Sequence, residues 1–128
     1  MTMSRLEAVL KGLDTQAAAA QGKLDQAAEF AARSEHLEVE GRSADEIAEV
    51  RVDGTGQVTS ITLDDDCQRL GPDRIAADVM EAMRQAQRRL SFRIEQLGND
   101  IYGEGSPTVR GFTDSYRNRY GYEPEEDQ

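Results

Sequence analysis

The chain has 128 residues, the size of one ordinary domain, and 25 acidic against 15 basic side chains give it a net charge of −10. This negative charge excludes uniform electrostatic attachment to nucleic acid or an anionic membrane, so any contact with DNA must be local. A single cysteine and a single histidine exclude an intrachain disulfide and a zinc site built from cysteines, and leave little for imidazole catalysis. We therefore expect that the protein is not an enzyme and that it binds no cofactor or metal.

Two further expectations concern location and assembly. No stretch of the sequence is apolar enough to span a bilayer and no signal peptide opens the chain, which predicts a cytoplasmic protein without a membrane partner. With 38% hydrophobic residues and no tryptophan, a monomer of this size would have a thin core. Burial at a subunit interface would compensate for that, so we expect an oligomer and specifically a dimer.

The first third of the chain has the periodicity of a long helix. Apolar residues recur at alternating spacings of four and three, which defines a heptad seam. Alanines in its middle would let a second backbone approach closely. The periodicity indicates that something covers this helix, either the rest of the chain or a second copy. The seam comprises Leu6, Leu10, Leu13, Ala17, Ala20 and Leu24 and continues through Ala27 and Ala31.

Three short runs with alternating polar and apolar residues follow, at residues 37–40, 48–52 and 58–63, and they predict β-strands. The segment Asp53-Gly54-Thr55-Gly56 joins the last two with glycines that tolerate positive φ, which indicates a hairpin. A longer polar turn over residues 41–46 joins the first two. Together they predict an antiparallel three-stranded meander that needs a helix against one face.

A second long helix is predicted to begin at Gly71-Pro72-Asp73, because proline fits a first helical turn and an acid suits its positive end. Its apolar stripe lasts to about Gly98. Beyond this point Gly, Pro, Asn, Asp and Tyr dominate, so we expect an irregular, tyrosine-rich tail over residues 99–128 that ends in acids. The predicted fold class is α+β, with the long helix, meander and second long helix forming one domain over residues 1–98. The stripe comprises Ile75, Val79, Ala82 or Met83, Ala86, Leu90, Ile94 and Leu97.

Several residues that could carry chemistry have simpler interpretations. The consecutive acids Asp64, Asp65 and Asp66 do not point at one centre, so a solvated loop that caps the next helix is favoured over a metal site. Cys67 has no fixed base beside it and is interpreted as a packing residue. His36 is interpreted as a capping or surface side chain.

The one concentrated cationic feature lies in the second predicted helix. Residues 84–93 contain four arginines and no acid, whereas residues 35–66 carry a net charge of −8. On a helix these arginines form two neighbouring rows away from Ala86 and Leu90, where they should be exposed and able to bind phosphates. The alternative is a solvated face that balances acids such as Glu81 and Glu95. The four residues are Arg84, Arg88, Arg89 and Arg93.

Basic and aromatic residues are also interleaved between Arg110 and Tyr122. This pattern is found in proteins that bind single-stranded nucleic acid and in short docking segments. Docking of the segment onto its own domain and simple disorder are the alternatives.

The order of a long helix, a three-stranded meander and a long helix resembles the YbaB/EbfC family of small bacterial nucleoid-associated proteins. The resemblance is carried by residues 49–64, which look like that family's hairpin and acidic turn, and by residues 78–87, which contain an Ala-x-x-x-Ala step among polar residues. It covers roughly residues 4–98. Residues 41–47 lack the family's usual glycine-rich approach to the second strand, and the tyrosine-rich segment after residue 98 is extra.

The resemblance implies a tweezer-like homodimer in which long helices project from a joined sheet core. It also implies binding of double-stranded DNA at the nucleoid, with weak sequence preference, through the basic helices and without a small-molecule substrate. Positions with suitable chemistry are the four arginines of residues 84–93 and, on the first helix, Arg5, Lys11 and Lys23. Related actinobacterial proteins are associated with type VII secretion loci. The net charge of −10, the alanine-centred seam and the aromatic segment after residue 98 favour an alternative function, a protein-interaction or chaperone-like module that does not bind DNA.

Overall fold

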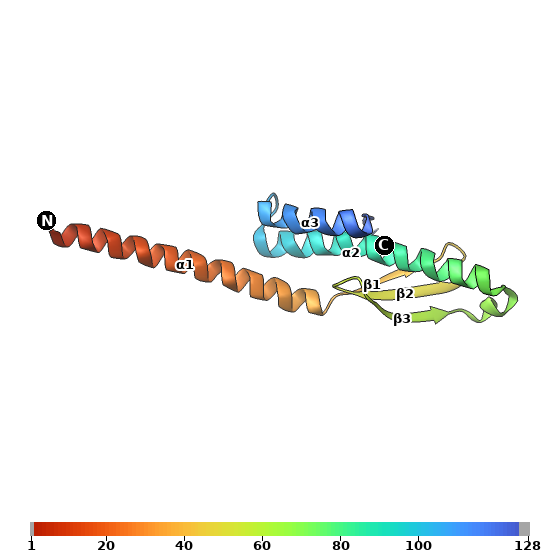
Figure 1. Cartoon of the computed structure of the whole chain (residues 1–128). Helices are drawn as coiled ribbons and strands as arrows, with labels where there is room; N and C mark the ends of the chain where they lie inside the picture. Colours follow the sequence, from red (N-terminus) through yellow and green to blue (C-terminus); the bar gives the residue numbers. More distant parts are fainter. Residues whose placement is uncertain (1, 126–128) are drawn as a thin grey trace.

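The computed structural model describes residues 2–125, with side chains from residue 4 onwards, as an α+β fold (Figure 1). The predicted order of a long helix, a three-stranded antiparallel sheet and a second long helix is confirmed. No helix in this part of the chain is long and apolar enough to cross a membrane. In chain order the elements are α1 (Thr2–Glu35), β1 (Glu38–Arg42), β2 (Ala48–Asp53), β3 (Val58–Leu63), the short 3₁₀ helix η1 (Asp65–Arg69), α2 (Pro72–Tyr102) and α3 (Pro107–Tyr120).

The three strands form an antiparallel sheet in the order β1-β2-β3. The predicted hairpin between β2 and β3 is present. The Asp53 carboxylate accepts hydrogen bonds from the Thr55 hydroxyl at 2.6 Å and from the backbone N–H groups of Thr55 and Gln57 at 2.9 and 3.1 Å. These bonds favour the charged carboxylate and hold the pKa of Asp53 below its usual value. Gly56 adopts a φ of 87°, which only glycine tolerates readily.

The core lies between α2 and the face of the sheet formed by β1 and β2. The helix presents its predicted apolar stripe to this face. Close contact depends on Gly41 of β1, because a Cβ atom there would overlap the backbones of Ala82 and Ala86 on α2. The side chains buried in this layer are Val39, Ala48, Val50, Val52, Ala82, Ala86, Leu90 and Ile94.

Strand β3 extends the sheet beyond the reach of α2. All six of its residues are exposed. Ile61 pairs with the buried Val50, and Val58 pairs with the buried Val52, so their side chains continue the apolar face of the core. Ile61 nevertheless remains 51% exposed. The described part of the chain therefore leaves an apolar strip uncovered beside its own core.

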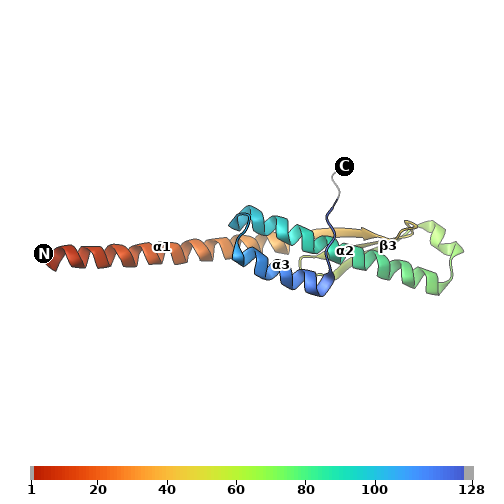
Figure 2. The same cartoon turned by 90° about the horizontal axis from the view of Figure 1, so that it is seen from above.

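The expectation of an irregular segment after residue 98 is wrong. Helix α2 continues one turn past Gly98, and a third helix, α3, then folds back along it (Figures 1 and 2). Gly98 is buried, and a Cβ atom there would lie 2.7 Å from the Phe112 ring and 3.1 Å from Val109. This glycine serves the contact between helices and does not end α2. Residues 126–128 of the expected tail lie outside the described residues.

The tyrosines of α3 attach it to the sheet. The Tyr116 hydroxyl donates to the Gly54 carbonyl at 2.8 Å, and the Tyr120 hydroxyl donates to the Thr55 carbonyl at 2.7 Å. Burial raises the pKa of Tyr116, which favours the neutral hydroxyl that donates this bond. Of the alternatives for this aromatic segment, docking onto its own domain is the one that the structure shows.

Helix α1 is an arm whose contacts with the rest of the described residues lie near its C-terminal end (Figures 1 and 2). There the Phe30 and Phe112 ring centroids lie 4.6 Å apart, and the Gln26 amide donates to the Ile101 carbonyl at 3.3 Å. Along the arm, the seam leucines are between 51% and 64% exposed, and Ala17 and Ala20 are exposed as well. The interpretation that the rest of the chain covers this seam is therefore wrong. These leucines are Leu6, Leu10, Leu13 and Leu24.

The substitution Gly41→Ala should lower the free energy of unfolding by about 1–3 kcal/mol, because the added methyl group would force β1 away from α2. Urea unfolding followed by circular dichroism measures this change. Gly111→Ala is the matched control, since this α3 glycine has open space around it. Alanine should leave stability unchanged or raise it by up to about 1 kcal/mol there. Wild-type stability of the Gly41→Ala variant would contradict the proposed close contact.

Candidate nucleic-acid interface

The four predicted arginines of α2 lie on the helix surface away from its buried stripe, but their exposure differs. Arg84 is exposed, whereas the side chains of Arg88, Arg89 and Arg93 retain 37%, 30% and 36% of their accessible surface. The expectation of exposed rows thus applies fully only to Arg84. The other three arginines lie partly covered by the segment that follows α3.

Acids from the C-terminal segment bind these three arginines. The Glu123 carboxylate accepts from Arg88 Nη2 at 3.5 Å and from Arg89 Nε at 3.3 Å. The Glu125 carboxylate accepts from Arg93 Nη1 at 3.4 Å. In addition, the Glu123 backbone N–H donates to the Arg88 carbonyl at 3.1 Å. The C-terminal segment therefore lies against α2 through both side-chain and backbone contacts.

We call residues Gly121–Glu125 the C-terminal strap. Tyr122 anchors it: the Arg117 guanidinium lies 3.7 Å from the ring centroid, and the Phe92 ring meets it edge-on at 6.0 Å. The Tyr122 hydroxyl donates to Glu95 at 3.2 Å. Burial and the nearby Glu95 carboxylate raise the pKa of Tyr122. In Figure 2 the chain leaves the end of α3 and crosses α2 at this point.

The backbone of strand β1 also contacts this surface. Arg89 Nη1 donates to the Glu40 carbonyl at 3.2 Å. An open pocket of about 310 Å³ separates Arg89 and Arg93 from the acidic outer face of the sheet. On that face Arg51 pairs with Glu40 at 2.7 Å. The pocket is lined by Glu38, Val39, Glu40, Arg51, Arg89, Arg93 and Glu125.

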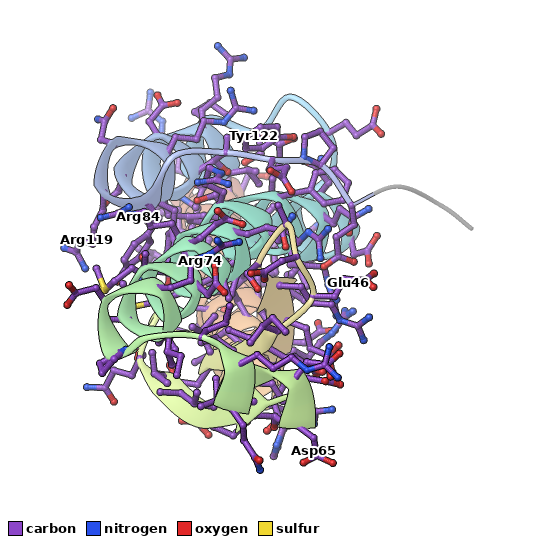
Figure 3. All side chains as sticks on the ribbon, turned by 90° about the vertical axis from the view of Figure 1, so that its right-hand side faces the viewer. Glu46, Asp65, Arg74, Arg84, Arg119 and Tyr122 are labelled. Carbon is purple, nitrogen blue, oxygen red and sulfur yellow. The ribbon has the colours of Figure 1, made fainter. Side chains whose placement is uncertain are left out.

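The remaining predicted cations lie on separate surfaces. Arg84 is on α2, and Figure 3 shows it on the same side of the molecule as Arg119 of α3. Arg5, Lys11 and Lys23 are exposed along α1. Across the described residues, neither Arg84 nor these three α1 side chains form an ion pair. The arm itself is nearly neutral, because it carries four cations and five carboxylates.

The sequence did not identify the partners of the arginine cluster. It suggested Glu81 and Glu95 as balancing acids, but Glu95 pairs with Arg117 at 3.0 Å, and the Glu81 carboxylate accepts from the Ala44 backbone N–H. The acids found on the arginines come from more than 30 residues further along the chain. The sequence signal for these partners was the opposite charge of residues 84–93 and the acidic end of the chain. Opposite charge alone does not show that the two segments are in contact.

The other residues that were considered as candidates for catalysis or metal binding lie in surroundings that favour the simpler interpretations. Asp64 caps η1 by accepting from the Asp66 backbone N–H at 2.9 Å. Cys67 is a free, half-buried thiol and His36 is exposed. Among the residues that the structure describes, no group of three or more His, Cys, Asp or Glu side chains is placed to hold a metal ion.

The model of the YbaB/EbfC DNA-binding family matches residues 7–104. A search of curated proteins finds no match. The matched range contains the sheet, α2 and most of α1, and therefore Lys11, Lys23 and the four α2 arginines. Arg5, α3 and the C-terminal strap lie outside it.

Proposed function

The chain belongs to the YbaB/EbfC DNA-binding family, and on that premise we propose that it binds double-stranded DNA as a homodimer at the cytoplasmic nucleoid. The observation that carries the proposal is the acid-free run of four arginines on α2, inside the matched range. Guanidinium groups bind phosphate oxygens through paired hydrogen bonds. Contacts of this kind position a protein on the duplex without reading bases, so the sequence preference is weak.

The α1 arms extend this contact. Arg5 and Lys23 lie on the same face of α1, about 27 Å apart along the helix, which spans about eight base pairs of a duplex. Lys11 lies between them on a neighbouring face. In a tweezer-like dimer, two such arms and two α2 surfaces would contact phosphates together. The proposed DNA-binding residues are Arg84, Arg88, Arg89, Arg93, Arg5, Lys11 and Lys23.

The dimer is supported by the apolar surfaces that this chain leaves uncovered. We propose that the α1 seam is covered by a second copy. Its leucines are more than half exposed, although a heptad pattern normally packs against a partner helix. The uncovered face of β3 is a second apolar surface available to the same assembly. The seam residues are Leu6, Leu10, Leu13, Ala17, Ala20 and Leu24.

DNA binding should fall steeply with salt. With about eight phosphates neutralised by the four α2 arginines of each protomer, a twofold rise in salt lowers affinity about 150-fold. The double variant Arg84→Ala with Arg88→Ala removes four arginines from the dimer and should reduce the slope of log affinity against log salt by about 3.6. Fluorescence anisotropy of a labelled duplex measures both quantities.

The charge-matched control is Arg42→Ala with Arg69→Ala, two exposed arginines outside α2. It should change affinity less than about twofold, because these sites act only through screened long-range charge. An equal loss in both double variants would contradict the assignment to α2. If the wild type does not bind duplex at about 0.15 M salt, the alternative protein-interaction module is favoured.

The seam assignment predicts a dimer that separates when charges enter the seam. Leu10→Glu with Leu13→Glu should give monomers in sedimentation velocity, because desolvating two carboxylates opposes association. The control Ala8→Glu with Thr15→Glu places the same charges on the opposite face of α1 and should remain dimeric. If the seam variant stays dimeric while Ile61→Glu dissociates, the contact lies at β3 and the seam assignment is wrong.

A further inference from the structure

We propose that the C-terminal strap is an autoinhibitory contact, in which Glu123 and Glu125 occupy the arginines that would otherwise bind DNA phosphates. The inference rests on the proposed function, because it assigns a regulator to the same surface. It concerns residues beyond the range that the family model matches. The structure shows what occupies the arginine surface, since the strap already lies on α2.

The spacing of the strap matches the spacing of the arginines. Arg89 and Arg93 are one helical turn apart, which is a rise of about 6 Å. Two residue steps of extended chain, from Glu123 to Glu125, span about 7 Å. Pro124 restricts φ and has no N–H group, which favours the extended conformation. Glu123 accordingly pairs with Arg88 and Arg89, and Glu125 reaches Arg93 one turn further along α2, as the strap crosses the helix (Figure 2).

The strap is anchored at one end and weakly held at the other. Tyr122 is fixed by Arg117, Phe92 and Glu95. By contrast, the ion pairs of Glu123 and Glu125 measure 3.3–3.5 Å and involve side chains that retain about a third of their accessible surface. Such pairs contribute little individually. The anchor keeps the carboxylates at a high local concentration, while a ligand with several phosphates can still displace them.

Arg84 gives DNA a place to begin this exchange. It lies one turn before Arg88 on α2, is exposed, and has no ion pair in the described chain. A duplex bound there presents successive phosphates near the next three arginines. Displacing the carboxylates then adds phosphate contacts, whereas an isolated small anion gains only one. The strap consequently weakens the binding of every anion to these arginines, and it weakens the binding of a polyanion such as DNA least.

The test is the double variant Glu123→Gln with Glu125→Gln in the full chain, which keeps side-chain shape and removes two charges. Its affinity for a labelled duplex should rise about three- to tenfold at about 0.1 M salt, because three partly exposed ion pairs no longer compete. The charge-matched control is Asp65→Asn with Glu104→Gln. Both are exposed, and Figure 3 shows Asp65 at the opposite end of this view from Tyr122. It should change affinity less than about twofold.

The outcomes separate this inference from the proposed function. If the wild type binds DNA and the strap variant gains no more than the control, the autoinhibitory contact is wrong and DNA binding stands. If neither the wild type nor the strap variant binds duplex at low salt, the proposed function fails and the inference fails with it. A selective gain in the strap variant, with unchanged thermal unfolding, supports the inference.

Discussion

The contact between Gly41 and the backbones of Ala82 and Ala86 determines how the rest of the structure is arranged. Because the strand and helix meet without intervening side chains, the rotation of α2 about its axis is fixed. The same helix face buries Leu90 and Ile94 against the sheet. Arginines at the intervening positions must then lie outside the core. The cationic surface is therefore a consequence of core packing, and its position does not depend on the arginines themselves.

This arrangement also explains why the chain leaves so much apolar surface uncovered. One helix is wide enough to cover β1 and β2 but leaves all of β3 exposed. Helix α1 contacts the rest of the chain through its last turns, including Phe30, while Leu6 to Leu24 project beyond it (Figure 1). A larger domain would bury such apolar surfaces within one chain. Here they are exposed and can be buried by assembly with a second copy. The low apolar content and the elongated shape thus have a common explanation.

Sequence patterns predicted the elements whose residues repeat with a regular period. Strand alternation located β2 and β3, and the 3.6-residue stripe identified the buried residues of α2 from Ala82 to Ile94. Composition misled at Gly98 and after it, because glycine there serves a close contact between helices. A helical spacing was present in Val109, Phe112, Tyr116 and Tyr120, but the surrounding Gly, Pro and Asn residues obscured it.

The candidate site was only partly predictable. The arginines are adjacent on one helix, so local periodicity places them together on its surface. Their occupation by Glu123 and Glu125 depends on the turn after α2, the packing of α3 and the seating of Tyr122. Each of these features depends on tertiary contacts, and no short sequence pattern predicts their combination. Net charge, taken alone, conceals both the cluster and the acids that neutralise it.

In the proposed scheme, one surface of α2 binds either the strap or the phosphates of DNA. Arginine side-chain Nε–Hε spectra, recorded while an unlabelled duplex is added to the full chain, test this most directly. Competition between the strap and DNA predicts saturable shifts at Arg84, Arg88, Arg89 and Arg93, together with a shift of the Glu123 backbone amide as its bond to Arg88 is lost. Shifts confined to arginines such as Arg42 and Arg51, with the Glu123 amide unchanged, would contradict it.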